Sequence, residues 1–124
     1  MQLAPDTHGQ PNVIVSYAPG KLRLRDRVLT TSSIVTADCV LPWPVTDAAA
    51  LTPELLAPVF ERAVKVVLLA TGPRQVWPPP ALFAHAAARG VGIEVMDLGA
   101  ACRTFNLLLG DQRPVALAAV LAAR

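Results

Sequence analysis

Five consecutive apolar residues, Val66–Ala70, are the feature of this sequence that most restricts its fold. A strand without polar residues must be covered on both faces, and such strands lie mainly inside parallel sheets whose faces carry helices. Gly72 and Pro73 end the run. The chain has 124 residues, 53% of them hydrophobic, which supplies the core of one domain and leaves no room for a second. We therefore predict one α/β domain, residues 1–124, built around this strand.

The segment before this strand indicates antiparallel β structure. Residues 21–25 alternate cations with leucine, which is the period-two pattern of a strand with one face in water. A β-rich run at residues 13–17 precedes them. Residues 28–41 are rich in Val, Ile and Thr and fit one bent strand or two short ones.

Helices and strands alternate in the rest of the chain. Thr52 is a favourable N-cap with Pro53 and Glu54 in the first turn, which predicts a helix over residues 52–63. Residues 114–123 fit a buried strand by their spacing, but their five alanines favour a helix. The other predicted elements are a helix at 81–89, a strand at 93–96 and a helix at 100–109.

Charge and hydropathy argue against several classes of protein. Eleven basic and nine acidic residues give a net charge of +2, too little for a nucleic-acid-binding protein. No apolar run approaches the roughly 20 residues that span a bilayer, so we predict no membrane insertion. The first twelve residues lack the features of a targeting peptide, and we expect a cytoplasmic protein. Cys39 and Cys102 form no metal-binding pattern with the histidines, so we predict no metal site and no cofactor.

Two loops are the candidates for a functional site. Ligands of open α/β sheets bind beyond the carboxyl ends of parallel strands, where the following loops converge. The loops at residues 71–80 and 97–103 face each other if the strands before them are parallel neighbours. The first of these loops carries Gly72, Arg74 and Trp77.

The second loop leads into a helix whose first amides are candidates for binding an anion. Gly99, Ala100 and Ala101 are small and would leave these amides accessible, with Arg103 beside them. Cys102 would lie in the first turn, where the helix dipole lowers a thiol pKa, which makes it the candidate nucleophile. The alternative for Cys102 is a buried, unreactive thiol, because no partner histidine is identified.

Other residues have both structural and chemical interpretations. Asp97 is predicted to cap the helix, with a catalytic acid as the alternative. Thr104 and Asn106 are kept as site candidates, because an Asn inside a helix needs a reason, either architectural or chemical. Trp43 and Trp77 lie beside prolines, where core packing is the favoured interpretation and a partner surface the alternative. The sequence contains no dinucleotide, phosphate-loop or nucleophile-elbow motif.

The segment from Met96 to Ala116 resembles the motif of a known family. It reads Met-Asp-Leu-Gly-Ala-Ala-Cys-Arg-Thr-Phe-Asn-Leu-Leu at 96–108 and Asp-Gln-Arg-Pro-Val-Ala at 111–116, after a strand that ends in Ala-Thr-Gly at 70–72. This pattern is similar to that of the MTH-938-like family, a domain of unknown function. The family includes the mitochondrial respiratory complex I assembly factor 3 and an adipogenesis-associated protein. The resemblance covers nearly the whole chain, and Trp43 also fits it.

The resemblance implies a mixed central sheet flanked by helices, with an additional antiparallel β layer. It also implies that residues 115–121 form a strand antiparallel to its neighbours. Three positions depart from the family's pattern: Leu98 replaces a threonine, Ala70 replaces the first glycine of Gly-Thr-Gly, and Asp-Gln at 111–112 replaces Glu-Gly. Because Leu98 would remove a hydroxyl from the candidate crevice, binding or scaffolding is favoured over a shared enzymatic mechanism.

From this resemblance, the leading hypothesis is an accessory or assembly-type module that binds a protein partner through the crevice and the loop tryptophans. The alternative is a small enzyme or ligand-binding domain in which the amides of residues 99–102 and Arg103 hold an anionic group beside the Cys102 thiol. The residues expected to form the crevice are Gly72, Arg74, Trp77, Asp97, Gly99, Ala101, Cys102, Arg103, Thr104 and Asn106.

Overall fold

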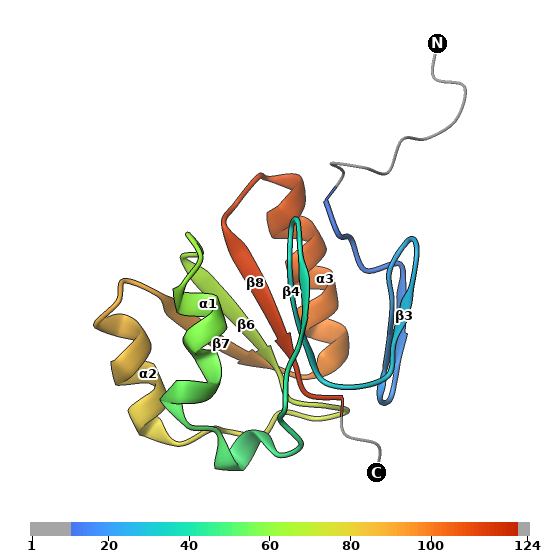
Figure 1. Cartoon of the computed structure of the whole chain (residues 1–124). Coiled ribbons are helices and arrows are strands. Elements are labelled where there is room, and N and C mark those ends of the chain that lie inside the picture. Colours follow the sequence, from blue (N-terminus) through green and yellow to red (C-terminus); the bar gives the residue numbers. More distant parts are fainter. Residues whose placement is uncertain (1–10, 122–124) are drawn as a thin grey trace.

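The structure is a computed structural model and describes residues 11–121 of the chain. The described part has three layers, which are visible in Figure 1. Helices α1 and α2 cover one face of a five-stranded sheet, and α3 covers the other face together with a three-stranded sheet that packs beside it. The predicted fold, a mixed central sheet flanked by helices with an additional antiparallel layer, is confirmed. Residues 1–10 and 122–124 of the predicted domain lie outside the described residues.

The central sheet has the strand order β5-β4-β8-β6-β7. Its strand β6 lies between β8 and β7 and is parallel to both, so the predicted buried parallel strand is confirmed. The strands of this sheet are β4 (Ser33–Thr36), β5 (Val40–Pro42), β6 (Val66–Ala70), β7 (Gly92–Met96) and β8 (Val115–Ala119).

Of residues 114–123, for which the sequence left both helix and strand open, residues 115–119 form strand β8. All five of its residues are buried, and small alanines fit the crowded space between the layers, so burial overrides their helical propensity. The expected antiparallel pairing is correct for β4 and wrong for β6, to which β8 is parallel. The reason is that α3 carries the chain back across the sheet after β7, so that β8 starts at the same end as β6 and β7.

Residues 16–29 form a separate antiparallel meander of β1 (Ser16–Ala18), β2 (Lys21–Arg23) and β3 (Val28–Leu29). Leu22 and Leu24 are buried while the cations around them are exposed, as the alternation predicts. The prediction of one or two strands over residues 28–41 is wrong in number. The segment forms β3, β4 and β5, because the chain passes from the meander into the central sheet after β3.

The three α-helices differ in how well the sequence predicts them. Helix α2 (Pro80–Ala87) and helix α3 (Leu98–Gly110) lie where they are expected, although α3 begins two residues early. The helix predicted over residues 52–63 is instead a 3-10 helix, η2 (Pro53–Leu56), followed by a single turn, α1 (Ala57–Phe60). Thr52 makes no side-chain cap, and Pro58 has no amide to continue an α-helix. No helix within residues 11–121 is long and apolar enough to cross a bilayer.

Two hydrophobic cores lie on opposite faces of the central sheet. The first joins the sheet to η2, α1 and α2 and contains Trp43, Leu56 and Leu82. The second joins the sheet to α3 and the meander and contains Leu22 and Phe105, both fully buried. Helix α3 therefore holds the additional β layer onto the rest of the fold.

Replacing Phe105 by Ala should lower the free energy of unfolding by about 3–5 kcal/mol, because it leaves a cavity at the centre of the second core. Leu107 on the same helix is 67% exposed, so Leu107→Ala should change stability by less than about 0.5 kcal/mol. Urea unfolding of the two variants checks the difference. Equal losses would show that α3 does not pack as described.

Candidate functional site

The carboxyl ends of β6 and β7 bring the two predicted loops together. The Thr71 amide donates a hydrogen bond to the Met96 carbonyl (3.0 Å), and the Leu98 amide donates one to the Gly72 carbonyl (2.7 Å). The expectation that the two loops face each other is therefore confirmed. The strand ends are joined directly by backbone hydrogen bonds, which fixes the geometry of this edge of the sheet.

The loop after β6 is held by Thr71. Its buried hydroxyl donates to the Arg74 carbonyl (2.7 Å) and accepts a hydrogen bond from the Val76 amide (2.9 Å). Gly72 has a φ of 119°, which a residue with a side chain rarely adopts. The Gln75 amide group adds a bond from its Nε2 to the Val95 carbonyl (2.9 Å). Thr71 and Gly72 thus stabilise the conformation of the loop.

Two clefts open at this edge of the sheet. The larger, about 530 Å³, lies between the loops after β5 and β6 and the β1–β2 turn, and Asp47 and Arg74 line it. The smaller, about 380 Å³, lies between Tyr17 and Arg103. Sequence reasoning missed Tyr17, Thr46 and Asp47, because their positions depend on the packing of distant segments and no local pattern marks them. Of the expected crevice residues, those that line these clefts are Gly72, Arg74, Asp97, Gly99 and Arg103.

Two of the three amides that were expected to be free at the N-terminus of α3, those of Ala100 and Ala101, are hydrogen-bonded. The Asp97 carboxylate accepts a hydrogen bond from the Ala100 amide (2.9 Å), which confirms Asp97 as the N-cap. The Asp97 carbonyl accepts from the Ala101 amide (3.0 Å). The Tyr17 ring lies against Gly99, where a Cβ would approach its hydroxyl to 2.9 Å. The prediction that Ala100 and Ala101 present unpaired amides to an anion is wrong.

Arg103 is engaged by the meander. Its Nη1 donates a hydrogen bond to the Tyr17 hydroxyl oxygen at 2.6 Å, on the exposed side of α3. This bond ties the helix to β1 and closes one side of the smaller cleft. The Arg103 guanidinium thus binds a side chain of the meander at the surface of the fold.

Cys102 is a buried thiol of the second core. It is 2% exposed and packs with Leu22, Leu24 and Phe105, beyond the first turn of α3. Burial raises the pKa of the thiol to about 12, and the nearby Arg103 charge opposes this rise only in part. The predicted lowering of the thiol pKa by the helix dipole is wrong, because the side chain points into apolar surroundings.

Asn106 holds the segment before β1. Its Oδ1 accepts a hydrogen bond from the Ile14 amide (2.8 Å), and its Nδ2 donates one to the Ile14 carbonyl (2.9 Å). Both ends of the side chain therefore bind the backbone, which supports the architectural interpretation. Thr104, two residues earlier on the helix, is half-buried. Ala101 is fully buried in the second core.

The two tryptophans have opposite environments. Trp43 is 4% exposed, and its Nε1 donates a hydrogen bond to the Leu55 carbonyl (2.7 Å), so its core interpretation is confirmed. Trp77 is 63% exposed and lies with its ring 6.2 Å from that of Phe83. Core packing is therefore wrong for Trp77, which lines neither cleft and presents a large amphipathic surface beside Phe83 of α2. Arg74 on the same loop is also exposed.

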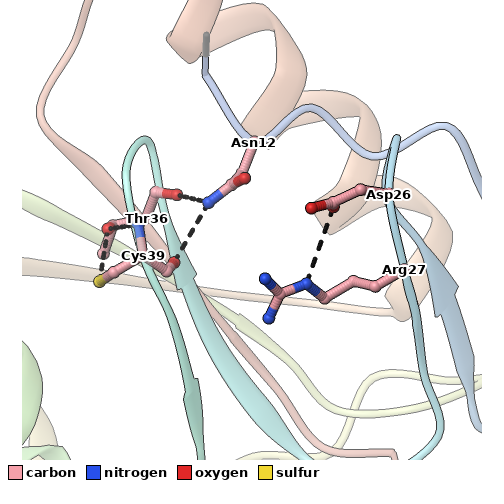
Figure 2. A network of polar contacts seen from close by, with 5 residues as sticks. All are labelled: Asn12, Asp26, Arg27, Thr36 and Cys39. Atoms are coloured by element: carbon pink, nitrogen blue, oxygen red, sulfur yellow. Dashed lines mark hydrogen bonds and ion pairs between the residues drawn. The ribbon is translucent and has the colours of Figure 1, made fainter. Parts of the chain in front are cut away.

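A polar network away from the crevice joins the chain before β1 to the β4–β5 turn, as Figure 2 shows. The Asn12 Nδ2 donates to the carbonyls of Thr36 (3.1 Å) and Cys39 (3.4 Å). The Thr36 Oγ1 lies 3.0 Å from the Cys39 Sγ. Cys39 and Cys102 are both free thiols. Among residues 11–121, no three His, Cys, Asp or Glu side chains gather as a metal site would require.

Comparison with known proteins agrees with this geometry. In curated proteins, the chain is 28% identical over 110 residues to NADH dehydrogenase [ubiquinone] 1 alpha subcomplex assembly factor 3 of Danio rerio, covering 87% of this chain and 63% of that protein. It therefore spans less than two thirds of that relative. It is 25% identical over 117 residues to a 13 kDa major membrane protein of Francisella tularensis, covering 93% and 95% of the two chains.

A solved structure shows the same fold. A Bordetella pertussis protein described as a Mth938-like domain matches with a TM-score of 0.80 at 26% identity, covering 99% of this chain and 94% of that one. The three layers and the edge of the sheet thus define an α/β domain of the Mth938-like class. Residues 14–120 match the family described as "Protein of unknown function (DUF498/DUF598)", and the chain belongs to this family. It is a distant homologue of complex I assembly factor 3.

Replacing Asn106 by Ala should lower the free energy of unfolding by about 1–3 kcal/mol, because it leaves the Ile14 amide and carbonyl without their partner. Urea unfolding measures the loss, and hydrogen exchange at the Ile14 amide should become faster. Thr104→Ala is the control on the same helix, with an expected change below about 0.5 kcal/mol. A loss no larger than that of the control would contradict the architectural role.

At neutral pH, an alkylating reagent should label Cys39 in the folded chain and leave Cys102 unmodified until the chain is unfolded, because Cys102 is buried and fully protonated. Mass spectrometry locates the label. The unfolded chain releases the Cys102 proton at a lower pH than the folded chain, so this group's contribution to stability is lost as the pH rises from about 9 towards 12. Equal labelling of both cysteines would contradict this.

Proposed function

We propose that this protein is an accessory or assembly-type module that acts in the cytoplasm by binding a protein partner, with residues 1–124 as one domain. The partner would contact the carboxyl edge of the central sheet around Trp77. The distant homology to an assembly factor supports this role. The observation that carries it is the exposed Trp77 side chain on a loop whose backbone is held in place.

Trp77 has the properties of an interface anchor. Tryptophan is enriched among the side chains that contribute most to protein interfaces, because it buries a large area with few rotatable bonds. Its 63% exposed ring gains this burial only when a partner covers it. Phe83, half-buried beside it, extends the apolar surface, and Arg74 adds a charge that can pair with a partner's carboxylate.

The loop that carries Trp77 is held in place by hydrogen bonds of its own residues. Thr71 and Gln75 hold it through the Arg74 and Val95 carbonyls and the Val76 amide. A loop with this many internal hydrogen bonds loses little conformational freedom when a partner binds, which favours affinity. The loop therefore presents Trp77 in one arrangement.

The alternative function is a ligand-binding domain or small enzyme with an anion beside Cys102. The two clefts, with Arg74 and Arg103 at their walls, are the observation that favours a small anionic ligand. Covalent chemistry at Cys102 is opposed by its burial and raised pKa. The capped amides of α3 oppose an anion at the helix N-terminus. Protein binding is therefore the better-supported proposal.

Trp77→Ala should reduce capture of the partner by roughly 30-fold, the loss expected for an interface anchor. The tagged chain is expressed at its native level in its own cells, cross-linked and purified, and the captured proteins are quantified. Leu107→Ala removes an equally exposed apolar side chain from a different surface and should retain the partner. Absence of any specific partner, or full retention by Trp77→Ala, would contradict the proposal.

A further inference from the structure

The positive charge of the chain is concentrated in the meander. Residues 16–29 carry four basic side chains and one acid, Asp26, for a net charge of +3. The other described residues carry six basic and seven acidic side chains, for a net charge of −1. The described chain is therefore polarised, with one cationic element on a body that is close to neutral.

Two of these cations, Lys21 and Arg23, share the outer face of β2. They flank Leu22, which is buried in the core beside α3, so they point away from that core. Arg25 follows the strand, and its Nη1 donates a hydrogen bond to the Pro11 carbonyl (2.6 Å). All three are exposed. We call this surface the cationic face.

The one acid of the meander does not neutralise this face. The Asp26 Oδ1 lies 3.7 Å from the Nε of Arg27, and Figure 2 shows the two side chains directed toward each other. The pair Asp26–Arg27 thus leaves Lys21, Arg23 and Arg25 without a carboxylate of the meander to balance them. Three charges on one small sheet repel one another unless an anion lies close by.

The neighbours of these cations are small or aliphatic. The register places Ser16 and Val28 opposite Arg23, and Ala18 opposite Lys21, and directly opposite residues point to the same face. Val28 is 48% exposed. Directly opposite Lys21 and Arg23 there is no aromatic side chain, so the face can approach a flat surface closely.

We propose that the cationic face docks on an anionic phospholipid surface. Protein interfaces are built around large aromatic anchors and are depleted of lysine, whereas only Ser16, Ala18 and Val28 lie opposite the cations of β2. A layer of anionic headgroups needs only an accessible row of cations, each of which adds to the attraction. Lys21 and Arg23 supply these cations beside the exposed Arg25, and Val28 adds aliphatic contact. The cationic face does not include Trp77, so the tests of this proposal and of the proposed function can fail independently of each other.

The test is sedimentation of the full chain with vesicles of phosphatidylcholine alone or of an equimolar mixture with phosphatidylglycerol. The chain should bind the mixed vesicles at low salt and be released at about 0.5 M salt, where charges are screened. The double variant Lys21→Gln with Arg23→Gln should lower the partition coefficient roughly 30-fold. Both side chains are exposed, so thermal unfolding should show that the variant remains folded.

The matched control is Lys65→Gln with Arg113→Gln, which removes the same charge. Both residues are exposed and lie outside the meander, just before β6 and β8. This control should reduce binding by less than about threefold. No binding to the mixed vesicles, or equal losses in the two double variants, would overturn the proposal. Binding to polyglutamate but not to the vesicles would also overturn it and would assign the cationic face to an acidic polypeptide.

Discussion

Helix α3 is packed on two sides at once, and this double contact determines most of the structure around it. Phe105 fills the core beside the central sheet, while the next residue, Asn106, holds the Ile14 backbone with two hydrogen bonds. At the start of the helix, Arg103 and Gly99 meet Tyr17 of the meander. The helix therefore cannot shift or rotate without separating the two sheets.

This packing explains why the motif at residues 96–108 resembles a functional site in sequence although several of its side chains hold the fold together. Its capping acid binds an amide of its own helix, Gly99 makes room for the Tyr17 side chain, and its Asn106 amide binds the Ile14 backbone. Its thiol is enclosed by apolar side chains. What remains at the surface is the edge of the sheet with Trp77 on one side of the fold and the cationic face of the meander on another. Both are surfaces suited to docking more than to chemistry.

The sequence predicts the parts of the fold that depend on local pattern. The apolar run at β6 and the alternation in residues 21–25 each lead to the correct element. The sequence-based prediction fails for side chains whose exposure depends on segments far away in the chain. Cys102 is buried because the meander packs over it, and Trp77 is exposed because no element covers it. In the helix predicted from Thr52, the start was placed well, but Pro58 interrupts it. The cleft residues Tyr17 and Asp47 leave no local signal at all.

The central claim is that the residues at the edge of the sheet build a docking surface and do not hold a small anionic substrate. A thermal-shift screen of the folded chain against anionic metabolites and nucleotides tests it most directly, because a ligand that binds only the folded state raises the melting temperature. The account predicts no saturable rise with any of these compounds. A saturable rise of several degrees that is lost in Arg103→Ala would contradict it and would show that the cleft beside Tyr17 is a ligand site.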